Sequence, residues 1–187
     1  MSEKYKKYTD LVYSYCKVDD SCTYFNPSKG SENNMIIINN FNEYKSLEGQ
    51  IIGVSAWHTI DQDQINRFAD ATLDNQWIHT DKERAEKEGP FKSTIAHGYL
   101  TLSLIPYLWK QIADVRNVKM EINYGIENLK FGDAVPVDSE VKLQATVKSV
   151  INLRGTVKAV VEAKLLIKDH IKPAYTGDVV FLYHFKY

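Results

Sequence analysis

Asp74 and His79 are the residues of this sequence whose types and spacing could carry out acid–base chemistry. They lie five positions apart in the segment LDNQWIHTD, with two amide side chains and a tryptophan between them. A carboxylate can orient and deprotonate a water molecule, and an imidazole, with an unperturbed pKa of about 6.5, can exchange a proton near neutral pH. If both side chains contact the same water, the segment can add that water to a substrate. The alternative interpretation is an ordinary solvated turn.

Two predicted helices flank this segment. Residues 61–72 begin with a capping-box pattern and place apolar residues on one face. Thr80 and Glu83 repeat the capping-box spacing, so a second helix is predicted to begin there and to end at Gly89. A connection held between two helices can be rigid enough to position reacting groups.

Residues 93–115, STIAHGYLTLSLIPYLWKQIADV, predict a buried helix. Their apolar side chains cover most of the helix circumference, so other elements must enclose the helix nearly all round. Pro106 lies in the middle and would break or kink the helix, which allows two abutting helical pieces.

The C-terminal third contains three stretches in which apolar and polar residues alternate: 140–150, 156–169 and 174–187. Short turns join them, so they predict an antiparallel sheet with one apolar face. Residues 51–60 predict a further strand. One apolar sheet face and a single apolar helix predict a curved antiparallel sheet wrapped around a long buried central helix, which is an α+β fold.

Composition limits the classes of protein that fit. A chain of 187 residues suits one domain, and a net charge of −1 gives no basic field for nucleic acid or an anionic membrane. No apolar run approaches the roughly 20 residues that span a bilayer, and no signal-peptide pattern begins the chain. Cys16 and Cys22 are too few for a disulfide scaffold. We therefore expect a cytoplasmic protein with reduced thiols and no membrane span.

Residues 1–40 differ in composition from the remainder, with many tyrosine, lysine, asparagine and serine residues. We predict that they form an N-terminal extension, and that residues 41–187 form the single domain. A short amphipathic helix within the extension would present one apolar face, made of Tyr8, Leu11, Val12 and Tyr15.

The segment from residue 68 to residue 106 resembles the hydratase segment of MaoC-like dehydratases. In that family an Asp and a His five positions apart precede an HG pair that opens the central helix, as Asp74, His79 and Gly98 do here. The sequences QWIH and TIAHGYLTLSLIP are most similar to those of the nodulation protein N branch. The segments INYGIENLKF and VPVDSEV extend the resemblance to roughly residues 41–187.

The resemblance implies a single hot-dog domain that hydrates a trans-2-enoyl thioester reversibly to an (R)-3-hydroxyacyl thioester. It implies Asp74 and His79 as the catalytic pair and either coenzyme A or acyl carrier protein as the carrier. No metal or redox cofactor is expected, and a homodimer is expected because a hot-dog sheet leaves edge strands to be paired. The family pattern Asp-x-Asn-Pro-x-His is altered here, so Asn75 or Gln76 takes the place of the supporting asparagine.

The backbone N–H of Gly98 is the candidate donor to the thioester oxygen. It lies in the first turn of the predicted buried helix, where N–H groups lack partners within the helix, and glycine permits close approach of a substrate. His97 either fixes the start of this helix by a hydrogen bond or transfers a proton itself. Further candidates for the acyl pocket are Trp77, Tyr99 and Ser103, although Trp77 also suits a packing role.

Two alternatives to hydration remain from the sequence. An acyl thioesterase on the same fold would use Asp74 to activate water against the thioester carbonyl, and a non-catalytic protein would only bind the acyl thioester. A metal site built from Asp74, His79, Asp81 and His97 is disfavoured because no ligand-spacing motif is present. Ser103 is not predicted to be a nucleophile because the sequence has no Gly-x-Ser-x-Gly elbow.

Overall fold

A six-stranded sheet is the main element of the computed structural model, which describes residues 35–186. Its strand order is β2-β6-β7-β8-β5, with β3 also paired to β6, and all of these pairings are antiparallel. The strands are β2 (Ile51–Val54), β3 (His58–Ile60), β5 (Val118–Phe131), β6 (Ser139–Leu153), β7 (Thr156–Ile167) and β8 (Tyr175–Phe185). The second, smaller sheet pairs two short parallel strands, β1 (Ile36–Ile38) and β4 (Ala113–Val115).

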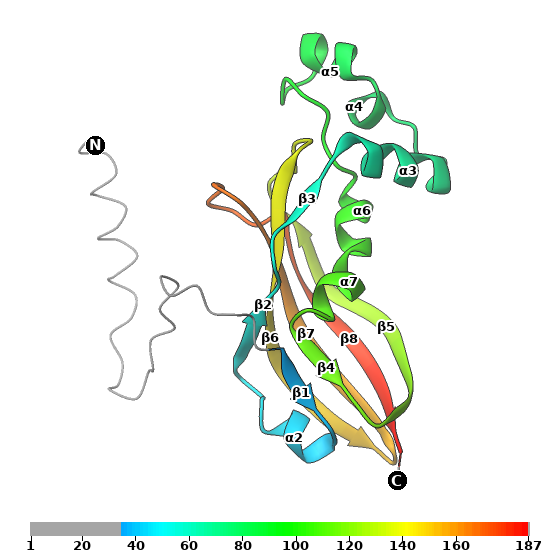
Figure 1. Ribbon diagram of the computed structural model, residues 1–187, viewed down its shortest axis with the longest axis vertical. Helices are drawn as coiled ribbons and strands as arrows, with labels where there is room; N and C mark the ends of the chain where they lie inside the picture. Colours follow the sequence, from blue (N-terminus) through cyan, green and yellow to red (C-terminus); the bar gives the residue numbers. More distant parts are fainter. Residues whose placement is uncertain (1–34, 187) are drawn as a thin grey trace, which may run out of the picture. The chain divides into compact units, whose positions relative to one another are not determined.

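The helices are short, and three of them lie together beyond one end of the large sheet (Figure 1). Those three are α3 (Gln62–Thr72), α4 (Trp77–Thr80) and α5 (Lys82–Glu88). Two others lie along a face of the sheet, α6 (Gly98–Ser103) and α7 (Ile105–Trp109), and α2 (Phe41–Lys45) lies toward its other end. The predicted α+β hot-dog arrangement is confirmed, since the sheet packs its apolar face against α6 and α7.

The alternating pattern of the central strands places their apolar residues in the core as predicted. Every odd position of β7 from Val157 to Ile167 is buried, and so are the facing positions of β6 from Val141 to Val147. Because successive side chains of a strand point to opposite faces, this alternation turns one whole face inward. The core therefore lies between this face and the two helices.

The central helix is divided at Leu104 into α6 and α7, in agreement with the two pieces that Pro106 allowed. Pro106 lies in the first turn of α7, where its missing N–H costs no helical hydrogen bond. The helix pair differs from the prediction in its exposure, because Tyr99 and Tyr107 are 70% and 54% exposed. The prediction that other elements enclose it nearly all round is therefore wrong at these two positions.

The helix caps and the strand predicted over 51–60 agree with the structure only in part. Asp61 caps α3 by accepting the Gln64 N–H, but α5 is capped by Asp81, which accepts the Arg84 N–H, and not by Thr80. The strand predicted over 51–60 is two strands, because the Ser55 hydroxyl and N–H both bond to the backbone of Leu143 and interrupt it.

Strand β5 was not predicted from alternation. Its pairing with β8 is interrupted by three register shifts, and most of its residues are exposed, so no single face is consistently apolar. In the described part of the chain it forms one end of the large sheet.

The body of the protein begins before residue 41. Strand β1 pairs with β4, and Ile38 is fully buried in the core. The predicted boundary at residue 40 is therefore too late. The predicted helix carrying Tyr8, Leu11, Val12 and Tyr15 lies outside the described residues, as do Cys16 and Cys22. Among the described residues, no helix is long and apolar enough to cross a membrane.

Candidate active site

Three chain segments bring Asp74, His79 and His97 together. Helix α3 ends at Thr72, the left-handed conformation of the following Leu73 (φ 63°) turns the chain, and the short helix α4 then carries His79 inward. His97 is the residue that precedes α6. One side-chain nitrogen or oxygen of each of the three residues lies within 4.8 Å of those of the other two. Both histidines are buried, whereas Asp74 is exposed.

The tautomer of His79 follows from its hydrogen bond. Its Nδ1 lies 2.7 Å from the carbonyl oxygen of Ile95, and a carbonyl can only accept, so Nδ1 carries the proton and Nε2 carries a lone pair. Burial lowers the pKa of His79 below its ordinary value and His97 lowers it further, which outweighs the Ile95 hydrogen bond and the Asp74 charge. At neutral pH His79 is therefore a neutral base with a lone pair on Nε2.

His97 holds the Asp74 segment. Its Nε2 donates to the backbone carbonyl of Asp74 at 3.0 Å, and its ring stacks on that of His79 with centroids 3.7 Å apart. The ring of Phe68 lies 5.1 Å from it. It makes no side-chain capping hydrogen bond to α6, and its hydrogen bond to the Asp74 carbonyl ties the start of that helix to the Asp74 segment. Its Nδ1 is buried and has no hydrogen-bond partner among residues 35–186.

Gly98 borders a cavity of about 390 Å³ that His79 also lines. A Cβ at Gly98 would lie 2.8 Å from Cε1 of Phe131, another lining residue, so glycine lets this ring approach the start of α6. The first N–H groups of a helix have no partner within it, so the Gly98 amide is free to serve a ligand as far as α6 itself is concerned. This cavity, with His79 and Gly98 in its wall, is the candidate active site.

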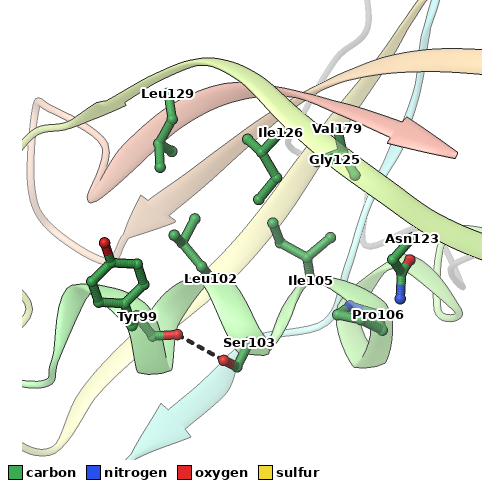
Figure 2. Close-up of a pocket in the computed structure, with 10 residues that line it drawn as sticks. All are labelled: Tyr99, Leu102, Ser103, Ile105, Pro106, Asn123, Gly125, Ile126, Leu129 and Val179. Atoms are coloured by element: carbon green, nitrogen blue, oxygen red, sulfur yellow. Dashed lines mark hydrogen bonds between the residues drawn. The ribbon is translucent and has the colours of Figure 1, made fainter. Parts of the chain in front are cut away.

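A second cavity of about 440 Å³ lies between α6, α7 and strand β5. Figure 2 shows Leu102 and Ile105 from the helices pointing toward Ile126 and Leu129 of β5. Tyr99 and Ser103, the predicted acyl-pocket residues, line this cavity and not the one beside His79. We call it the apolar groove. The complete lining is Tyr99, Leu102, Ser103, Ile105, Pro106, Asn123, Gly125, Ile126, Leu129 and Val179.

An aromatic pair links the walls of the two cavities. The ring of Tyr99, in the groove, lies edge-on to the ring of Phe131, in the candidate active site, with centroids 6.3 Å apart. Phe131 was not singled out from the sequence. The only signal was its place at the end of INYGIENLKF, because its role depends on where β5 ends relative to α6.

The remaining predicted residues contact the site through backbone or neighbouring groups. The carbonyl of Gln76 accepts the His79 N–H at 2.9 Å, and the carbonyl of Asn75 lies 3.4 Å from the Thr80 hydroxyl. Trp77 lies beneath the Arg84 guanidinium, 4.5 Å from the ring centroid, which agrees with a packing role. Gln62 donates to the carbonyl of His79 at 2.8 Å, and no sequence signal pointed to it.

Comparison with known proteins identifies the class. Residues 44–169 match the family described as MaoC like domain, and the chain belongs to that family. It is 49% identical over 102 residues to 3-hydroxyacyl-thioester dehydratase Z of Mycobacterium tuberculosis, which covers 54% of this chain and 67% of that protein. It is 46% identical over 100 residues to Nodulation protein N of Rhizobium meliloti, covering 53% of this chain and 62% of that protein.

A solved structure supports the fold. R-hydratase PhaJ1 from Pseudomonas aeruginosa superposes with a TM-score of 0.59 at 20% identity, covering 76% of this chain and 86% of that one. At this identity the likeness shows the hot-dog fold alone. Together with the family match, it confirms the resemblance that the Asp–His spacing and the HG pair suggested.

Proposed function

We propose that this protein adds water reversibly to a trans-2-enoyl thioester of coenzyme A or acyl carrier protein, giving a 3-hydroxyacyl thioester. Family membership and the 49% identity to a protein named as a 3-hydroxyacyl-thioester dehydratase support the reaction class. The observation that carries the proposal is the close approach of Asp74 and His79 beside a cavity that His79 lines.

In the proposed reaction one water lies between the Asp74 carboxylate and Nε2 of His79, and both groups accept hydrogen bonds from it. As the water oxygen attacks Cβ, His79 takes one proton and then returns it to Cα. The net result is addition of OH and H across the double bond, with both side chains regenerated. Asp74 orients the water and stabilises the transient positive charge on His79.

The developing negative charge falls on the thioester oxygen, and the backbone N–H of Gly98 is the proposed donor to it. The start of a helix favours negative charge because its first N–H groups point outward. His97 is a positioning residue in this scheme, since its Nε2 bonds to the backbone of Asp74.

The apolar groove is the proposed site for the acyl chain. Its lining is mostly aliphatic, and the Tyr99–Phe131 pair stands between it and the cavity of His79. An acyl chain in the groove would place its thioester toward Gly98 if Phe131 turns aside. Trp77, by contrast, packs against α5 and is proposed as an anchor for α4.

We also propose a homodimer and a cytoplasmic location. The edge strand β5 exposes large apolar side chains, and an edge of 14 residues needs to be paired or covered. These side chains are Met120, Tyr124, Ile126 and Phe131. Size-exclusion chromatography with light scattering measures the molar mass of the protein in solution. The mass of a monomer would contradict the proposed dimer. The cytoplasmic location rests on the cysteine content, which is too low for a disulfide scaffold.

The experiment that tests the function is incubation with crotonyl-CoA and longer trans-2-enoyl-CoAs, following loss of the conjugated-enoyl absorbance. Saturated acyl-CoAs in parallel, with a thiol reagent, detect thioester hydrolysis. Loss of absorbance without free thiol supports hydration. Free thiol identifies a thioesterase, and saturable binding without either change identifies a non-catalytic acyl-thioester protein.

A further inference from the structure

Asp74, His79 and His97 have the ligand types of a transition-metal site. A carboxylate oxygen and two imidazole nitrogens suit Zn²⁺, and three protein ligands leave its fourth position open. The three ligand atoms lie within 4.8 Å of one another. We propose that this group binds a divalent transition metal ion such as Zn²⁺ in place of the water, as a reversible inhibitory site.

Both histidines are held as metal-binding histidines usually are. A metal-bound imidazole normally donates its other N–H to a carbonyl or carboxylate, which fixes its tautomer. His79 donates Nδ1–H to the carbonyl of Ile95, and His97 donates Nε2–H to the carbonyl of Asp74. The nitrogens left for coordination are Nε2 of His79 and Nδ1 of His97.

One nitrogen of His97 is buried without a partner. This residue is 2% exposed, and its Nδ1 has no hydrogen-bond partner within residues 35–186. Leaving a buried polar atom unpaired is unfavourable, because its hydrogen bonds to water are lost and nothing replaces them. A bound metal ion would give this lone pair a partner, which hydration chemistry at His79 does not.

The site can contract to the distances that Zn²⁺ requires. Bonds from Zn²⁺ to imidazole nitrogen and carboxylate oxygen are about 2.0–2.2 Å, and the three ligand atoms already lie within 4.8 Å of one another, so small shifts bring them into bonding range. The rings of His79 and His97 stack with centroids 3.7 Å apart, and each imidazole lone pair lies in the plane of its ring, so the two rings must tilt apart to share one ion. Asp74 is exposed and follows the turn at Leu73, so its carboxylate can move with them.

Asp81 does not belong to this group. It was part of the four-residue metal site that the sequence disfavoured, and its carboxylate accepts the Arg84 N–H at the start of α5. The ligand set is therefore one carboxylate and two histidines, with a coordination position left for water. Only the inhibitory consequence rests on the proposed function, because the metal takes the lone pair of His79 that hydration needs.

The test is calorimetric titration of the full chain with ZnCl₂ after treatment with a chelator. Cys16→Ser and Cys22→Ser are combined in the background, so that thiols contribute no binding. We expect one ion per chain and a melting temperature that rises with ZnCl₂, because binding to the native state stabilises it. Zn²⁺ should also inhibit hydration, and the chelator should restore it.

Three variants define the ligands. Asp74→Asn, His79→Gln and His97→Gln should each weaken binding at least about tenfold, since loss of an outer-shell partner alone typically costs about 10- to 100-fold. His184→Gln, on the β8 strand, is the matched control and should bind as the parent does. Asp74 is exposed, so its variant should fold even if His97→Gln does not.

Absence of binding, or equal binding by Asp74→Asn and the parent, overturns the proposal. A visible Co²⁺ spectrum of tetrahedral type in the parent, lost in His79→Gln, supports it independently of activity. The titrations contain no substrate, so the two proposals can fail separately. Zn²⁺ binding without hydratase activity retains the metal site and rejects hydration, and hydration without binding rejects the metal site alone.

Discussion

Helix α6 borders two cavities whose chemistry differs. Beside Gly98 and Thr101 lies the cavity lined by His79, where hydrogen bonds to carbonyl groups fix the imidazole groups. Beside Tyr99, Leu102 and Ser103 lies the apolar groove. Residues three apart on a helix share a face, so one short helix can serve both.

The difference shows what each task requires of the fold. Proton transfer depends on tautomer and distance, so the groups around His79 are held by backbone carbonyls that cannot change their role as acceptors. Holding an acyl chain depends on shape, and aliphatic side chains from two elements suffice. Variants on the two sides of α6 should therefore fail in different ways.

The largest effect is expected from Asp74→Asn and His79→Gln. Each should lower turnover by about 100- to 10,000-fold, the usual range for loss of a general acid or base. The order of preference among acyl chain lengths should not change, because the groove is untouched. Steady-state kinetics with a series of enoyl-CoAs measures both quantities, with His184→Gln as control. A folded variant of either residue with near-parent turnover would show that the pair is not catalytic.

Gly98→Val should lower turnover by about 100- to 1,000-fold, the cost typical of losing one oxyanion donor. Alanine should be milder because it adds one methyl group, although even its Cβ meets the Phe131 ring. Turnover and melting temperature are measured on the same samples.

Phe131→Ala in the Gly98→Val background separates two causes of that loss. Recovery of activity would assign the loss to displacement of the ring. Continued loss with an unchanged melting temperature supports the oxyanion role. A stable and fully active Gly98→Val would remove the thioester from this helix end.

Leu102→Phe should fill part of the apolar groove. We expect KM for a long-chain enoyl-CoA to rise about tenfold, with KM for crotonyl-CoA little changed, because a few methylene groups in a pocket are worth about 1–3 kcal/mol each. Leu153→Phe, at an exposed position of β6, is the matched control. Equal effects on short and long chains would contradict the assignment of the groove to the acyl chain.

The acid limb of the pH–rate profile should lie below pH 6.5. Burial lowers the pKa of His79, and the reaction needs its neutral form, so activity falls only when the pH drops through this lowered value. An ordinary histidine would already be about half protonated at pH 6.5. The kcat/KM profile of the free enzyme measures this limb. An acid limb with its midpoint above 6.5 would contradict the lowered pKa, and activity that falls as the pH rises through this range would mean that His79 acts in its charged form.

The same shift gives a smaller effect on stability. The unfolded state binds the histidine proton more readily than the folded state, so the contribution of His79 to the free energy of unfolding is fully present above about pH 6.5. It falls as the pH drops from there to the lowered pKa of folded His79, and below that value His79 contributes no further change. Chemical denaturation at several pH values in this range measures the free energy of unfolding. We expect it to fall with pH in the parent and to lack this dependence in His79→Gln.

The smallest effect is expected from removal of residues 1–32. Residues 33–187 form a compact unit of their own, which contains both cavities, so the shortened protein should stay folded and active. Size-exclusion chromatography and the hydration assay test this. Aggregation would show that the tyrosine-rich segment covers apolar surface.

The sequence by itself determined the features that depend on neighbours in the chain. Alternation along β7 predicted its buried face because side-chain direction in a strand repeats every two residues. Pro106 predicted the division of the central helix because proline lacks an N–H. The Asp74–His79 spacing and the HG pair at His97 indicated the family, which the match over residues 44–169 confirmed.

Only the tertiary structure decided the contacts between distant segments. The tautomer of His79 depends on the Ile95 carbonyl, 16 residues away, and no local pattern encodes that approach. Phe131 reaches Gly98 because register shifts in β5 set where the strand ends. The same shifts break the alternation of apolar and polar residues, so the sequence pattern did not predict β5. Exposure of Tyr99 and Tyr107 likewise depends on which side of the helices the sheet covers. Packing in three dimensions determines each of these, because the free energy of a contact depends on its partner and not on the spacing between the two in the chain.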